Sequence, residues 1–169
     1  MELEQAIRKL NGDRQFNSWK KSRANAYFSY AFRMFLDSED DWQIGYYDKD
    51  NDKITTFVVK ENAVDMKSEE DVFKEESTSV LPIDKSKLKL KLDKIMDKAK
   101  KFQSSKYPKE IPVKIISILQ NLDNLGTIWN ITYITASFNT LNMKIKADDG
   151  SIAEHKLLPL LSFKKDDTK

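Results

Sequence analysis

Apolar residues recur with a helical period in two segments of the chain. The first segment is predicted to be a short helix by four residues at positions i, i+3, i+4 and i+7: Leu3, Ala6, Ile7 and Leu10. Gly12 suits the left-handed position at which such a helix ends. The second segment is predicted to be a long amphipathic helix that ends before Tyr107-Pro108, and its apolar face comprises Leu88, Leu92, Ile95, Ala99 and Phe102.

Other runs have the alternation, or the content of β-branched and aromatic residues, that is typical of strands. These runs are 25–36, 42–47, 54–59, 111–122, 128–134, 141–145 and 152–158. The run 25–36 also fits a helical stripe, so a helix is the alternative there. Residues 14–25 are polar and basic around Phe16 and Trp19, which favours a loop, with a helical turn within it as the alternative. Ser68 followed by acidic residues favours a short helix over about 69–75.

The predicted elements follow the same order twice. Trp42-Gln43-Ile44-Gly45-Tyr46 matches Trp129-Asn130-Ile131-Thr132-Tyr133 at an offset of 129 − 42 = 87 residues. We therefore predict an α+β fold of two similar halves, each a helix packed on a small antiparallel sheet, with both W-x-I-x-Y motifs facing the cores. The alternative is chance convergence of two helix–strand–hairpin patterns. The predicted boundaries are 1–77 for the first repeat, 78–84 for a linker, 85–162 for the second repeat and 163–169 for a flexible tail.

The second half resembles a PepSY-type module, which has a helix, a strand, a Trp-led strand and a strand that ends in a Gly-containing acidic turn. In this chain Ala147-Asp148-Asp149-Gly150-Ser151-Ile152 lies at the position of that turn. The first half fits more loosely, because Asp48–Ile54 replaces the turn without its glycine. The resemblance implies a cystatin-like helix on an antiparallel sheet and a binding role of the kind that regulates peptidases, with no catalytic motif.

Composition excludes several kinds of chemistry. The chain has no cysteine and one histidine, which rules out disulfides, thiolate zinc sites and paired-histidine catalysis. Lys and Arg number 29 against 27 Asp and Glu, and this near balance is unlike the basic excess of most nucleic-acid binders. The polar start lacks the apolar core of a signal peptide, and no run is long enough to span a membrane. We expect a cytoplasmic protein with no membrane partner.

Four groups of residues are candidate sites. Asp48, Asp50 and Asp52 open like a calcium loop, but Lys53 and Val59 stand where an EF-hand needs Gly and Glu, so an acidic turn is the preferred interpretation. His155 has no partner at a catalytic spacing, and turn chemistry explains Asp148 and Asp149. The basic and aromatic segment Trp19–Arg23, with Lys20 and Lys21, could contact nucleic acid if it converged with the lysines of the second half.

These observations predict a non-catalytic binding or regulatory module for a protein or peptide partner, with no cofactor and no metal. Alternation places four residues on the sheet face away from the helices, which is the predicted binding surface: Tyr47, Asn130, Thr132 and Asn142. Ordinary solvent-facing residues are the alternative interpretation of this set. A nucleic-acid-binding protein and a hydrolase are the two alternative functions.

Overall fold

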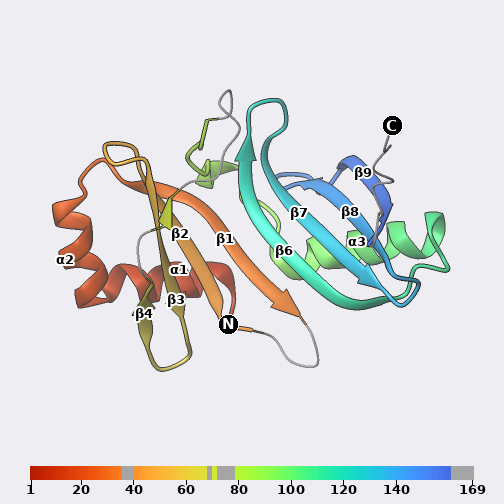
Figure 1. Cartoon of the computed structure of the whole chain (residues 1–169), viewed down its shortest axis with the longest axis horizontal. Coiled ribbons are helices and arrows are strands. Elements are labelled where there is room, and N and C mark those ends of the chain that lie inside the picture. Colours follow the sequence, from red (N-terminus) through yellow and green to blue (C-terminus); the bar gives the residue numbers. More distant parts are fainter. Residues whose placement is uncertain (36–39, 68–69, 72–78, 161–169) are drawn as a thin grey trace, which may run out of the picture.

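The computed structural model describes residues 1–35, 40–67, 70–71 and 79–160. The helices are α1 (Leu3–Gly12), α2 (Arg14–Ser22) and α3 (Leu92–Lys106), with a 3-10 turn at Lys85–Lys87. The strands are β1 (Tyr27–Phe35), β2 (Trp42–Asp48), β3 (Lys53–Val59), β4 (Val64–Met66), β5 (Glu70–Asp71), β6 (Pro112–Leu122), β7 (Gly126–Thr135), β8 (Asn139–Lys146) and β9 (Ile152–Pro159). Figure 1 shows the helices behind the strands.

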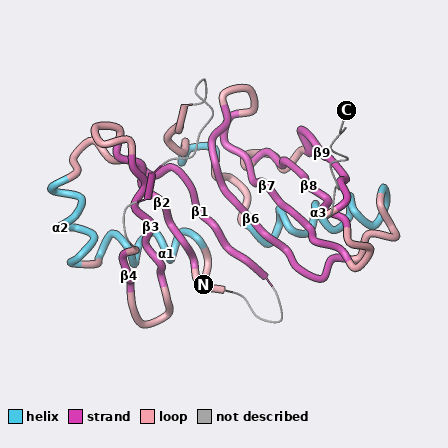
Figure 2. The backbone as a smooth tube through the Cα atoms, viewed as in Figure 1, coloured by secondary structure: helices cyan, strands magenta, loops and turns pink. Residues whose placement is uncertain are grey.

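All the strands belong to one antiparallel sheet with the order β4-β3-β2-β1-β6-β7-β8-β9, and β5 also pairs with β3 (Figure 2). The α+β class is confirmed, and one continuous sheet runs through both halves of the chain, a point that the sequence left open. The join is made by β1 and β6, where Phe32 lies opposite Ile118 and Met34 lies opposite Ile116. Sequence patterns cannot show this join, because either strand could equally have formed an edge of its own sheet.

A single apolar core lies between the helices and the sheet. All six motif residues that alternation assigned to the core are buried: Trp42, Ile44, Tyr46, Trp129, Ile131 and Tyr133. The two tryptophans pack against each other with ring centroids 6.3 Å apart, so the motifs of the two halves meet in the core. Buried side chains of α1, α2 and α3 complete this same core from one side of the sheet.

The described part of the predicted linker is fastened to both halves of the sheet. The Ile83 side chain is buried, and its N–H donates to the Phe28 carbonyl on β1 (2.9 Å). The Asn121 amide on β6 donates to the Pro82 carbonyl (2.7 Å), and the Asp84 N–H donates to the Thr127 hydroxyl (3.3 Å). These bonds make residues 79–84 part of the fold. The predicted tail 163–169 lies outside the described residues.

The segment predicted to be a loop over residues 14–25 contains helix α2. Asp13 caps this helix by accepting a hydrogen bond from the Phe16 N–H (2.9 Å), and Phe16 and Trp19 enter the core three residues apart. The same Asp13 ends α1, because its backbone is extended. Gly12 is therefore the last residue of α1, and it does not adopt the left-handed conformation that we expected.

The structure also decides two further predictions, one for residues 25–36 and one for residues 69–75. Residues 27–35 form a strand, so the strand interpretation of 25–36 is correct and the helical one is wrong. Glu70–Asp71 pair with β3 as β5, where a helix over about 69–75 was expected, and the rest of that segment lies outside the described residues. A backbone partner on β3 supplies hydrogen bonds that the local acidic pattern could not reveal.

Candidate functional site

The sheet face away from the helices, which we call the open face, is the surface on which the sequence placed the binding residues. Alternation along the strands assigns residues to it in rows that run across the sheet. One row passes from Phe32 on β1 through Ile118, Asn130 and Lys144 to Glu154 on β9. The row therefore changes from apolar at the centre of the sheet, through an amide, to charged at the edge.

The centre of the open face is apolar. The half-buried side chains of Phe32 and Met34 on β1 lie opposite those of Ile118 and Ile116 on β6. In a sheet whose other face packs against helices, alternation normally leaves polar residues here. Sequence reasoning missed these four residues. The signal was present, because both the odd and the even positions of β1 and β6 are apolar, which indicates a strand with contacts on two faces.

Three of the four predicted binding residues come together next to this apolar centre. The side-chain amide of Asn142 on β8 donates hydrogen bonds to the Asn130 side-chain oxygen (2.5 Å) and the Thr132 hydroxyl (2.8 Å), both on β7. All three side chains are half-buried. They form a connected polar group that holds β7 and β8 in register on the open face and leaves amide and hydroxyl atoms at the surface.

Lysines dominate the outer part of the open face. Lys144 on β8 pairs with Glu154 on β9 (2.6 Å), and Lys156 on β9 is exposed opposite Asn142. Lys114 lies on β6 opposite Ile134 on β7. This edge of the face consequently favours a partner that carries carboxylates.

Tyr47 is the exception among the predicted binding residues. Alternation assigned it to the correct face, but its side chain is only 6% exposed. Its hydroxyl donates to Asp52 (2.5 Å), and its ring packs edge-on against Tyr27 at 5.5 Å, while the Tyr27 hydroxyl donates to the Val80 carbonyl. Tyr47 is therefore a structural residue of the β2–β3 turn and is not available as a contact.

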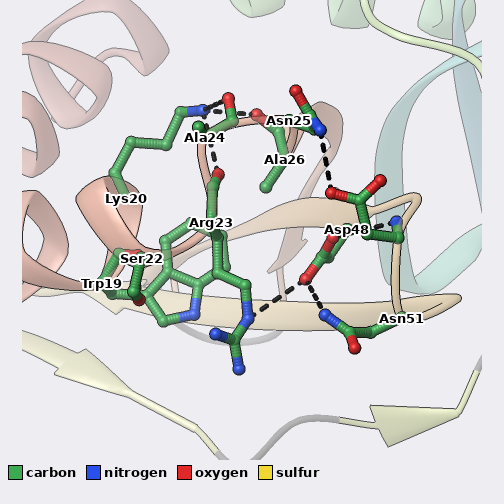
Figure 3. A network of polar contacts seen from close by, with 10 residues as sticks. Trp19, Lys20, Ser22, Arg23, Ala24, Asn25, Ala26, Asp48 and Asn51 are labelled. Carbon is green, nitrogen blue, oxygen red and sulfur yellow. Dashed lines mark hydrogen bonds and ion pairs between the residues drawn. The ribbon is translucent and has the colours of Figure 1, made fainter.

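The three aspartates of this turn, Asp48, Asp50 and Asp52, make hydrogen bonds and an ion pair within the fold. The Asp48 carboxylate is buried, pairs with Arg23 (3.1 Å) and accepts a hydrogen bond from Asn51 (2.7 Å), as Figure 3 shows. Asp50 accepts a hydrogen bond from Asn25 (2.8 Å). No cluster of three potential metal-binding side chains occurs among the described residues. The expected acidic turn agrees with this geometry.

The basic segment near α2 does not converge with the lysines of the second half. The Lys20 ammonium donates to the carbonyls of Ala24 (2.8 Å) and Ala26 (2.7 Å), just beyond the end of α2 (Figure 3). Arg23 is engaged with Asp48. Helix α2 lies at one end of the molecule and α3 at the other (Figure 1), so Lys20 and Arg23 have structural partners and are far from the second group of lysines.

His155 on β9 bonds to a tyrosine and a lysine. Its Nδ1 lies 2.8 Å from the Tyr107 hydroxyl, its Nε2 lies 3.1 Å from the Lys106 ammonium, and its ring packs 5.0 Å from Phe102. An ammonium can only donate, so Nε2 is the acceptor and Nδ1 carries the proton. This arrangement ties β9 to the end of α3.

The β8–β9 turn uses both of its aspartates. The Asp149 carboxylate accepts the Ser151 N–H (2.7 Å), and hydrogen bonding from the Ser151 side chain, together with this backbone bond, lowers the pKa of Asp149. Asp148 lies 3.9 Å from Lys87, and Gly150 has a φ of 72°. These contacts agree with the predicted turn at 148–151.

Comparisons with known proteins give information about the fold and none about the function. No protein-family model matches the chain, and no curated protein matches it. A crystal structure of "a putative lipoprotein" from Clostridium difficile 630 has a similar fold, with a TM-score of 0.54, 12% identity, and coverage of 85% of this chain and 90% of that chain. In the part of the chain that the structure describes, no helix is long and apolar enough to cross a membrane.

Proposed function

We propose that this protein is a non-catalytic binding module whose open face holds a protein segment that carries apolar and acidic side chains. The observation that carries the proposal is the apolar centre of the open face on β1 and β6. Among the described residues, the helices pack on the other face of the sheet, and Phe32, Met34, Ile116 and Ile118 are half-buried on the open face. A partner that covered them would remove their apolar surface from water, which stabilises a complex.

The chemistry beside the apolar centre specifies the partner further. Asn130, Thr132 and Asn142 offer hydrogen-bonding atoms at the depth at which a bound segment would lie. Beyond them, Lys156 is exposed and favours a carboxylate, whereas Lys144 already pairs with Glu154. An extended segment with alternating side chains would place its apolar residues on the centre and its acidic residues toward β9.

A regulatory role of the PepSY type is a hypothesis within this proposal. It is supported by the order of elements, because α2 is followed by β1 to β4 and α3 is followed by β6 to β9. The first strands of the two runs, β1 and β6, pair antiparallel. We infer from this arrangement that the two halves arose by duplication. A peptidase whose activity changes when the protein is added, and does not change with an open-face variant, would support the regulatory role.

There are two different expectations for the cellular location of this protein. The expectation from the sequence is the cytoplasm, whereas the description of the similar Clostridium difficile protein as "a putative lipoprotein" favours a place outside it. Fractionation of cells that express the native gene, with detection of the chain in each fraction, distinguishes the two.

The test of the binding proposal is a selection of displayed random peptides on the purified protein. We expect enrichment of peptides in which apolar residues and Asp or Glu alternate. Met34→Lys should weaken their binding by about tenfold or more, because a charge would lie at the centre of the contact. The matched control is Met66→Lys, since Met66 is 40% exposed at the opposite edge of the sheet, on β4.

Both variants must first retain the melting temperature of the wild-type protein. Equal peptide binding by wild type and Met34→Lys would remove the open face as the site. Enrichment of basic peptides would contradict the proposed partner chemistry.

A further inference from the structure

Apolar side chains are exposed together at one end of the sheet, where β6 begins, β7 turns into β8 and β9 ends (lower right of Figure 1). We call the following residues the apolar tip: Ile111 (63% exposed), Val113 (59%), Phe138 (71%), Leu158 (44%) and Leu160 (45%). Backbone hydrogen bonds hold their segments together, from the Ala136 N–H to the Ile111 carbonyl (2.9 Å) and from the Leu160 N–H to the Phe138 carbonyl (2.8 Å). A group of exposed apolar side chains on neighbouring segments is typical of an interaction surface.

Phe138 is unusual in conformation as well as in exposure. Its φ is 57°, in the left-handed region that glycine and asparagine adopt readily and a phenylalanine adopts at a cost. The fold itself gains little from the ring, because the ring is mostly in solvent. An aromatic side chain at this position therefore costs stability, which is understandable if the ring contacts something outside the protein.

Hydrogen bonds to a buried carboxylate support the turn that carries Phe138. The Glu110 side chain is buried, and its carboxylate accepts hydrogen bonds from the Thr135 hydroxyl (2.8 Å) and the Asn139 amide (3.1 Å). These residues flank the β7–β8 turn on both sides of Phe138. The turn that carries Phe138 is thus anchored to the loop between α3 and β6.

The exposed charged side chains around the apolar tip are all positive. In the segments 105–116, 134–142 and 155–160, the residues with charged side chains are Lys106, Lys109, Glu110, Lys114 and Lys156. The single acid, Glu110, is buried, so the surface charge comes from lysines. Two copies of the tip placed face to face would bring these lysines together, which disfavours self-association.

We propose that the apolar tip docks on the surface of a membrane that contains anionic lipids. Phe138 and its apolar neighbours would enter the boundary between headgroups and acyl chains, and the lysines would lie among the anionic headgroups. The contact is peripheral and uses no spanning segment. It goes beyond the peptide-binding function proposed above, because its apolar contact is the tip, which leaves the apolar centre of the open face free. The expectation of no membrane partner was drawn from the lack of a run long enough to span a membrane, and a peripheral contact is a separate hypothesis.

The test is co-sedimentation of the purified full chain with vesicles. We expect binding to phosphatidylcholine vesicles that contain phosphatidylglycerol, weaker binding as salt is raised, and little binding to phosphatidylcholine alone. Phe138→Asn should reduce binding by about tenfold, because it removes the ring that enters the lipid. The same variant should melt at a higher temperature than wild type, since asparagine tolerates a positive φ. A loss of binding can then not be attributed to unfolding.

Two further variants complete the experiment. Met66→Asn removes an exposed apolar side chain on β4, far from the tip, and should bind vesicles like wild type. Lys109→Glu should weaken binding by more than about fivefold, because it removes one cation from the surface and adds an anion. Equal binding to both vesicle types, or wild-type binding by Phe138→Asn, would overturn the proposal.

Other partners give different results. A second copy would appear as concentration-dependent dimerisation that Phe138→Asn abolishes, and a protein partner would leave the protein unbound to either vesicle; each outcome overturns the lipid proposal. Failure of the peptide-binding proposal is separate, because Met34→Lys should bind vesicles normally and Phe138→Asn should bind selected peptides normally.

Discussion

The ring of Tyr30 on β1 lies directly over Gly45 on β2. The Tyr30 hydroxyl reaches across β2 to the Thr56 hydroxyl on β3, 2.7 Å away. A Cβ atom on Gly45 would overlap the Tyr30 ring, so this glycine is required by close approach of a side chain and not by its backbone conformation. One aromatic residue thereby links three neighbouring strands on the open face.

This relationship predicts that Gly45→Ala destabilises the protein. The added methyl group must displace the Tyr30 ring and break its hydrogen bond to Thr56, and we expect a loss of about 1–3 kcal/mol in the free energy of unfolding. Urea denaturation measures it. Gly12→Ala is the control, because Gly12 is helical and a Cβ there meets nothing within 4 Å; it should be neutral or slightly stabilising. A tolerated Gly45→Ala would show that Tyr30 can move away cheaply.

The acidic turn predicts that calcium does not stabilise the protein. The Asp48 carboxylate is already engaged by Arg23 and Asn51, so addition of calcium should leave the melting temperature unchanged. Asp48→Ala should cost about 1–3 kcal/mol, because it leaves these partners without their acceptor. Asp50→Ala, which removes an exposed hydrogen bond to Asn25, should cost less. A calcium-dependent rise in melting temperature that Asp48→Ala abolishes would contradict this view.

The buried tyrosines predict loss of stability in alkali. Burial raises the pKa of Tyr46 and of Tyr133 to about 12, from an ordinary value of 10.0. The folded state therefore keeps protons that the unfolded state releases, so this contribution is complete below about pH 10 and declines as the pH rises toward 12. Denaturation at several pH values measures the slope. Tyr133→Phe should reduce that slope by up to about one proton, and an unchanged slope would contradict the assignment.

The buried Glu110 predicts a local role at the β7–β8 turn. Glu110→Ala removes the acceptor of Thr135 and Asn139, and we expect a loss of about 2 kcal/mol together with faster amide exchange around the turn. Glu154→Ala is the matched control, because its ion pair with Lys144 is exposed and should contribute less than about 1 kcal/mol. Similar losses in the two variants would show that burial of Glu110 has no special importance.

Part of the candidate site could be predicted because strand alternation is a local property. The period of two assigned Asn130, Thr132 and Asn142 to one face, and the structure brings them into one hydrogen-bonded group. Tyr47 was assigned to the correct face, but its exposure depends on Tyr27 and Asp52, which cover it from other segments. Burial by distant residues leaves no periodic signal in the sequence.

The amino-acid sequence by itself determined the α+β class, most of the helices and strands, and the burial of both W-x-I-x-Y motifs, because periodicity and turn residues act over a few positions. Tertiary structure alone decided that β1 pairs with β6, that one sheet runs through both halves, and that Phe32 and Met34 meet Ile118 and Ile116 on the open face. It also decided that Ile111, Phe138 and Leu160 gather at one end. These contacts join residues that are far apart in the chain, and their free energy depends on packing and hydrogen bonds that no local pattern encodes.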